Sequence, residues 1–151
     1  MKVKEIMTRA VLSVSPDDNA REALDILLKR KISGLPVLDR EGKIAGMFTE
    51  KEVLSYILPS YLGKVGSFIY EENPKSISKK IADLSNLKVN DVMRREVAKI
   101  SEEVNISEVA RVMLVHKLRR IVVVDSSDKV IGIVSRGDVV KSLFMQAVAG
   151  V

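Results

Sequence analysis

Apolar residues recur at helical spacing in two stretches of the chain, and a polar cluster precedes each stretch. An α-helix brings residues i, i+3, i+4, i+7 and i+8 to one face, so such a stripe predicts a helix packed on a core. The first stripe comprises Ala20, Ala23, Leu24, Leu27 and Leu28. The second comprises Ile106, Val109, Ala110, Met113 and Leu114, with Val112 and Val115 outside the stripe. The polar clusters 15–18 and 101–103 predict where the two helices begin.

Short apolar runs rich in Val, Ile and Leu surround each predicted helix. Their length and composition predict strands at residues 11–14, 35–38 and 44–48, and again at 97–100, 121–124 and 130–134. A second helical pattern closes each set. Its apolar residues are Val53, Leu54, Ile57 and Leu58 in the first set, and Val139, Val140, Leu143, Phe144, Met145 and Val148 in the second. Each set therefore predicts a β-α-β-β-α unit.

The two units are copies of one another. Residues 2–58 align on residues 88–144 without a gap, and identical or similar residues coincide throughout: Val3 with Val89, Met7 with Met93, Gly46 with Gly132, Thr49 with Ser135, and Glu52 with Asp138. Such a register indicates a tandem duplication. One copy has too little sheet to bury itself, so we expect an α+β (α/β) fold in which both copies pack as one pseudo-two-fold module.

This alignment divides the chain into repeat 1 (1–58), an inter-repeat insert (59–87), repeat 2 (88–146) and a short tail (147–151). The insert matches neither repeat. Residues 76–84 predict a short helix, and the apolar residues Leu62, Val65, Phe68, Ile69 and Tyr70 predict that the insert packs on the body or on a neighbouring subunit.

Composition narrows the class of protein. The 151 residues are 46% hydrophobic but include no cysteine, which excludes disulfides and thiolate metal sites. No apolar run reaches the roughly 20 residues of a membrane span, so we expect a soluble, cytoplasmic protein. The net charge of +5 is spread among acidic residues without an aromatic stacking platform. Of the three functions that we consider, a regulatory binding module, an interaction scaffold and a nucleic-acid binder, the last therefore has the least support.

The segment Gly132–Asp138 carries the strongest candidate chemistry. It joins a predicted strand to a predicted helix and places Ser135 at the N-cap position. The open N–H groups of a helix start favour an anion, and a short carboxylate such as Asp138 can accept from a ribose diol. The same spacing is also close to a capping box, in which Asp138 only closes the helix start. The sequence leaves both interpretations open.

The order and repetition of several motifs resemble the tandem cystathionine-β-synthase (CBS) domain pair, or Bateman module. These motifs are residues 4–8, 32–39, 46–49, 90–93 and 132–138. The resemblance implies a regulatory protein that binds adenosine derivatives (AMP, ADP, ATP or S-adenosylmethionine) in two clefts between the copies. It maps the ribose acid to Asp138, the phosphate-contacting hydroxyl to Ser135, and the base slot to Ile121 and Val122. Nearby cations that could reach phosphates are Lys117, Arg119, Arg120 and Arg136.

Two positions depart from the family pattern. In the first copy the acid is Glu52 rather than Asp. The residues of this copy that correspond to the site of the second are Leu35, Pro36, Thr49 and Glu52. The longer Glu52 can fold back onto the Thr49 N–H as in a capping box, so we expect this first cleft to be degenerate or differently occupied. In the second copy Val122 replaces the family's proline. We expect its extra N–H to lie at the lip of the cleft and to alter how the base is held.

Nothing in the sequence indicates an enzyme. The single histidine, His116, has no Cys, Ser or Asp constellation around it, and no Gly-rich phosphate loop precedes a Lys. We expect no catalytic cofactor and no metal. Two classes lead: a regulatory module that binds an adenine nucleotide and signals to an unknown effector protein, and a dimerisation scaffold whose sites are vestigial. Surplus apolar residues on the second helices, together with the resemblance, predict a homodimer.

Overall fold

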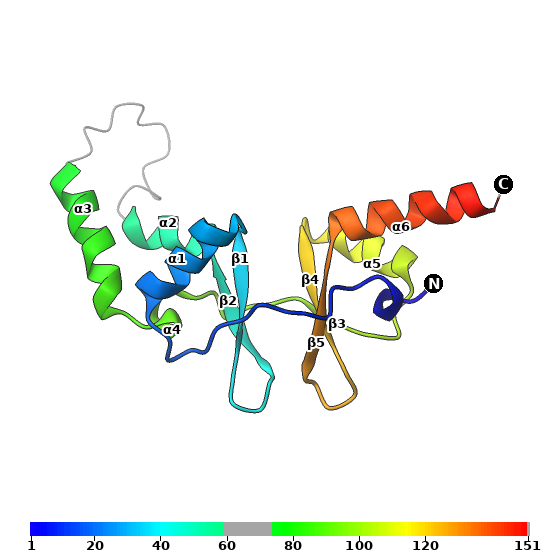
Figure 1. Ribbon diagram of the computed structural model, residues 1–151, viewed down its shortest axis with the longest axis horizontal. Coiled ribbons are helices and arrows are strands. Elements are labelled where there is room, and N and C mark those ends of the chain that lie inside the picture. The colour runs from blue at the N-terminus through cyan, green and yellow to red at the C-terminus, as the bar shows by residue number, and fades with distance from the viewer. Residues whose placement is uncertain (59–73, 151) are drawn as a thin grey trace. The chain divides into compact units, whose positions relative to one another are not determined.

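The computed structural model describes residues 1–58 and 74–150. The described residues form two compact units (Figure 1). One combines Met1–Leu12, Glu41–Ile44 and the residues from Val97 onward; the other combines Ser13–Arg40 with the described residues between Ala45 and Glu96. The mixed α+β class predicted from the sequence is confirmed by helices that accompany two small sheets. Most of the insert, residues 59–73, and its predicted apolar contacts lie outside the described residues.

The unit that contains the second repeat is built on a three-stranded sheet in the order β3-β4-β5. Strands β3 and β4 run parallel, and β4 and β5 are antiparallel, with Arg120 opposite Ser135 and Ile121 opposite Val134. Helices α5 and α6 lie beside this sheet (Figure 1). Their buried residues Val109, Met113 and Val139 share a core with β4 and β5. The elements are η1 (Val3–Glu5), β3 (Lys99–Ser101), α5 (Ile106–Val115), β4 (Arg120–Val124), β5 (Val130–Ser135) and α6 (Arg136–Ala149).

The other unit is built on a β1-β2 pair. Its core joins Ala20, Ala23 and Leu27 of the first helix to Leu35, Val37 and Phe48 of the strands. Its elements are α1 (Ala20–Arg30), β1 (Gly34–Leu38), β2 (Ile44–Thr49), α2 (Glu50–Ile57), α3 (Pro74–Asp83), η3 (Leu84–Asn86) and α4 (Val89–Val92). Two stripe residues, Leu28 and Leu114, are exposed at corresponding positions of the two repeats, so the stripes are narrower than predicted.

Each repeat contributes its first residues to the unit that holds the other repeat's sheet. We call residues 3–8 and 89–94 the lead-in segments. Thr8 exchanges two backbone hydrogen bonds with Ile133 of β5, at 2.9 and 3.0 Å. Arg94 exchanges two with Met47 of β2, at 2.8 and 2.9 Å. The buried Met7 and Met93 then complete the two cores.

The predicted strand at 11–14 is wrong: only Val14 pairs, in a single parallel bridge to Val37. The reason lies in one residue of the neighbouring strand. Pro36 has no N–H and contributes only its carbonyl, which accepts from the Val14 N–H at 3.0 Å. In the second repeat Val122 occupies the matching position, and its N–H donates to the Ala98 carbonyl at 3.4 Å. That added bond accompanies the continuous strand β3.

Both first helices begin later than predicted, because Asn19 and Asn105, rather than the polar clusters before them, are the N-cap residues. The first cluster forms a turn of its own: the Ser15 N–H donates to Asp18 Oδ2 at 2.8 Å, and the Asp17 N–H donates to Ser15 Oγ. Ser and Asp side chains form such local bonds readily. The polar residues precede each helix as predicted, but those of the first cluster stabilise a turn and not the helix.

Candidate functional site

Ser135 and Asp138 lie at the junction of β5 and α6, where the strand ends and the helix begins. The Asp138 N–H donates to Ser135 Oγ at 3.1 Å, and the Ser135 N–H donates to Asp138 Oδ2 at 2.9 Å. These reciprocal bonds form a capping box, which is one of the two interpretations that the sequence left open. Among the residues that the structure describes, Asp138 Oδ1 has no hydrogen-bond partner. The carboxylate therefore closes the helix start with one oxygen and can accept further bonds with the other.

Three of the predicted basic residues, Arg119, Arg120 and Arg136, lie at this junction by their backbone. The Arg136 N–H donates to the Arg119 carbonyl at 2.9 Å, and Arg120 is the register partner of Ser135. The Arg136 side chain is anchored, because its Nε donates to the Leu118 carbonyl at 2.7 Å. Lys117 begins the same loop in a left-handed conformation, with φ of 54°. The first N–H groups of a helix carry a partial positive charge, which favours an anion at this junction.

The predicted base slot is part of the sheet. Ile121 and Val122 are almost fully buried on β4, and Ile121 belongs to the core beneath the helices. Successive strand residues point to opposite faces, so Val122 lies on the other face. The Val122 N–H, which we expected at the lip of the cleft, is not left without a partner. It donates to Ala98 instead, since β3 pairs with β4 at this point.

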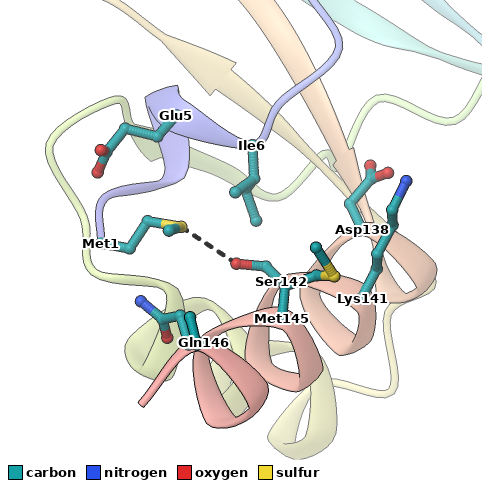
Figure 2. A pocket seen from close by; sticks show the side chains of 9 residues that line it. Met1, Glu5, Ile6, Asp138, Lys141, Ser142, Met145 and Gln146 are labelled. Atoms are coloured by element: carbon teal, nitrogen blue, oxygen red, sulfur yellow. Dashed lines mark hydrogen bonds between the residues drawn. The ribbon is translucent and has the colours of Figure 1, made fainter. Parts of the chain in front are cut away.

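A pocket of about 520 Å³ lies between the N-terminal segment and α6 (Figure 2). Of the site residues predicted from the sequence, all within the described part of the chain, only Asp138 lines it. Figure 2 shows Asp138 and Lys141 at one end and Glu5 at the other, with the Ser142 hydroxyl directed at the Met1 sulfur at 3.2 Å. The lining comprises Met1, Glu5, Ile6, Asp138, Lys141, Ser142, Met145, Gln146 and Ala149.

Sequence reasoning did not assign Glu5 or Lys141 to any site. The α6 lining residues follow helical spacing from Asp138, so a search along that face would have found Lys141. Glu5 is far from Asp138 in the sequence, and no local pattern connects the two segments.

The corresponding residues of the first repeat are arranged differently. The Glu52 N–H donates to Thr49 Oγ1 at 3.4 Å, and the Thr49 hydroxyl donates to Glu52 Oε2. The other oxygen, Glu52 Oε1, pairs with Arg94 Nη1 at 3.3 Å. The prediction that Glu52 folds back onto the Thr49 N–H is therefore wrong: the hydroxyl and Arg94 bind the carboxylate. Leu35 and Pro36 are buried in β1, and Leu35 belongs to the core.

Arg94 was not predicted as a site residue. The repeat alignment could have indicated it, because Arg94 aligns with Thr8 within two otherwise similar lead-in segments.

Within residues 1–58 and 74–150, no helix is both long enough and apolar enough to cross a membrane.

Comparisons with known proteins agree on one family. The family model for the CBS domain matches residues 3–59 and 89–144. The uncharacterized protein MJ1426 of Methanocaldococcus jannaschii is 33% identical over 160 residues, which cover 95% of this chain and 91% of that protein. The chloroplastic CBS domain-containing protein CBSX1 of Arabidopsis thaliana is 29% identical over 148 residues, and these cover 93% of this chain but 63% of CBSX1.

Solved structures give the same result. A crystal structure of the CBS-pair protein CBSX2 from Arabidopsis thaliana has a TM-score of 0.76 and 26% identity, with 97% of this chain and 96% of that chain covered. A crystal structure of CBSX2 in complex with AMP has a TM-score of 0.73 and 26% identity, with coverage of 97% and 98%.

Proposed function

Because the chain belongs to the CBS domain family and carries the domain twice, we propose that it is a regulatory module that binds an adenosine nucleotide through Ser135 and Asp138. The observation that carries the proposal is the β5–α6 junction. There, Asp138 Oδ1 has no partner within the described residues, the Ser135 hydroxyl caps the helix, and Arg119, Arg120 and Arg136 lie close by in the backbone. The AMP complex of CBSX2, a protein of similar fold, supports the choice of ligand.

The chemistry of each group suits one part of such a ligand. A ribose cis-diol donates two hydrogen bonds, and a carboxylate accepts them as charge-assisted bonds of about 1.5–3 kcal/mol each. The α6 N-terminus and the neighbouring guanidinium groups attract phosphate. The module then binds a ligand without transforming it, and passes the signal to an effector protein.

One specific observation favours the alternative function, a dimerisation scaffold whose nucleotide sites are vestigial. Both acidic residues, Asp138 and Glu52, already bind the residue that caps their helix. If these contacts are their whole role, the two repeats hold a partner and bind no nucleotide.

We also propose that two copies of the chain associate through α6. Val140, Phe144 and Val148 follow one another at i, i+4 and i+8, and each is 58–65% exposed. Leu114 and Val115 of α5 are exposed as well, at 76% and 60%. Large apolar side chains gathered on helices mark a protein interface. A two-fold axis lets the same face cover itself, so a second copy is the simplest partner.

Calorimetric titration with AMP, ATP and S-adenosylmethionine tests the ligand proposal. We expect Asp138→Ala to weaken nucleotide binding about ten- to a thousandfold, since it removes one or two charge-assisted bonds and each decade corresponds to about 1.4 kcal/mol. Asp138→Asn should recover part of the affinity, because the amide oxygen still accepts.

Glu52→Ala is the matched control, because it removes the equivalent acid of the first repeat. We expect it to leave nucleotide affinity nearly unchanged. Equal losses from Asp138→Ala and Glu52→Ala would indicate two working sites. If the unmodified chain binds none of the three compounds, the scaffold function is correct.

A further inference from the structure

The Arg94–Glu52 ion pair distinguishes the Thr49–Glu52 position from the Ser135–Asp138 position. Arg94 Nη1 lies 3.3 Å from Glu52 Oε1, and the Glu52 side chain is only 11% exposed. The corresponding pair in the unit that holds the second repeat's sheet is Thr8 and Asp138, and no cation among the described residues forms an ion pair with Asp138. Glu52 thus forms an ion pair with a cation, whereas Asp138 forms none within the described residues.

Arg94 is held in this position by its backbone. It exchanges two hydrogen bonds with Met47 of β2, and its Nε donates to the Glu96 carbonyl at 2.9 Å. Thr8 exchanges the same backbone bonds with Ile133 of β5. Since the two lead-in segments are fixed alike, the difference between the two sites rests on the side chain at this one position.

The consequence for a ligand follows from the contacts of the Glu52 carboxylate. One oxygen accepts from Arg94 and the other from the Thr49 hydroxyl. A ribose diol would have to displace these donors from a largely buried group. The contact is charge-assisted, and breaking it would leave a largely buried carboxylate without its cation, so a neutral diol competes poorly for Glu52.

We propose that Arg94 is the residue that closes the Thr49–Glu52 position to nucleotide, so that each chain binds one nucleotide rather than two. This inference rests on the proposed function, because it assumes that the Ser135–Asp138 position binds nucleotide. It adds the residue that determines which of the two positions does so. Arg94 acts through Glu52 and is therefore a positioning residue.

Titration calorimetry with AMP tests the inference by stoichiometry. Arg94→Thr gives the Thr49–Glu52 position the lead-in residue of the Ser135–Asp138 position, and Arg94→Thr with Glu52→Asp also gives it the same acid. We expect one AMP per chain in the unmodified protein and two in the double variant. Arg95→Thr is the matched control: it removes an adjacent cation that donates to Asn90 Oδ1 at 3.1 Å, and the stoichiometry should stay at one.

The reciprocal variant Thr8→Arg places a guanidinium at the position that corresponds to Arg94 and should weaken AMP binding at least tenfold. Circular dichroism checks that each variant is folded. If Arg94→Thr lowers the melting temperature below the assay temperature, Arg94→Gln, which keeps the length but not the charge, is used in its place. An unmodified chain that binds two AMP, or a folded double variant that still binds one, overturns the inference. An unmodified chain that binds no AMP, ATP or S-adenosylmethionine overturns the proposed function instead.

Discussion

Met7 packs so closely against Gly132 that a β-carbon at Gly132 would lie 2.5 Å from the Met7 sulfur. The same relationship recurs between Met93 and Gly46, where the sulfur would lie 2.8 Å away and the Arg94 carbonyl oxygen 2.6 Å away. Both glycines lie in the strand that pairs with a lead-in segment. Their missing side chains let the backbone of that segment approach the sheet.

We expect Gly46→Ala to destabilise the protein more than Gly132→Ala. The new methyl group at Gly46 meets a backbone carbonyl, which cannot move without breaking the Met47–Arg94 pairing. At Gly132 it meets mainly the flexible Met7 side chain. Overpacking typically lowers the free energy of unfolding by about 1–3 kcal/mol. We expect a loss near the upper end of this range for Gly46→Ala and near the lower end for Gly132→Ala.

Gly137→Ala is the control for this pair, because its β-carbon would lie 3.7 Å from Ser135 Oγ, an ordinary contact, on a helix that favours Ala. Urea denaturation measures all three free energies of unfolding. A loss at Gly137 equal to that at Gly46 would contradict the close-approach explanation.

Asn19→Ala should cost more stability than Asn105→Ala, although both residues are N-caps at matching positions of the repeats. Asn19 Oδ1 accepts from the Glu22 N–H at 3.1 Å, and its Nδ2 donates to the Ser85 carbonyl at 2.8 Å. The Asn105 side chain makes no capping bond. We expect a loss of about 1–2 kcal/mol for Asn19→Ala and less than about 0.5 kcal/mol for Asn105→Ala. Thermal unfolding of the two variants gives the comparison, and equal losses would contradict it.

The sequence predicted most elements but not how the lead-in segments pair. Local periodicity predicted the strands around Val37 and Val123 and the helices around Leu27 and Met113, because burial of one face imposes that period. The pairing of Thr8 with Ile133 depends on a contact between distant residues, which no local pattern encodes. Similarly, the Pro36-to-Val122 difference was visible, but its effect on strand pairing required knowledge of which backbone groups face one another.

For the candidate site as well, the sequence predicted local contacts but not those between distant segments. The capping box of Ser135 and Asp138 was predictable, because the cap and the acid lie within one helix turn, whereas their role toward a ligand stays a prediction. Arg94 was missed because it reaches Glu52 from another segment of the chain.

We expect Glu103 to titrate far below an ordinary glutamate. Hydrogen bonds from Lys2 and Lys4, at 2.8 and 2.7 Å, lower the pKa of Glu103 from 4.5 to about 2. Because the folded-state pKa is depressed, this contact contributes its full stability above pH 4.5 and loses it as the pH falls towards about 2. All three side chains are exposed, so added salt should weaken the effect.

Nuclear magnetic resonance of the Glu103 carboxyl carbon measures this pKa directly. In the Lys2→Ala, Lys4→Ala double variant the midpoint should return towards 4.5, because both hydrogen-bond donors are gone. A midpoint near 4.5 in the unmodified protein would show that the two lysines do not hold Glu103 in solution.

The exposed apolar face of α6 predicts that Phe144→Glu converts a dimer into a monomer. Phe144 lies at the centre of that face, between Val140 and Val148. A buried, unpaired carboxylate in an apolar interface costs several kcal/mol, and each 1.4 kcal/mol raises the dissociation constant about tenfold, so the dimer dissociates at micromolar concentration. Gln146→Glu is the matched control, because position 146 lies about 200° around the helix from Phe144 and the new charge remains outside the face. Light scattering at micromolar concentration should give the mass of two chains for the unmodified protein and for Gln146→Glu, and of one chain for Phe144→Glu. An unmodified protein that is monomeric at this concentration, or a Phe144→Glu variant that stays dimeric, would mean that α6 does not form the interface.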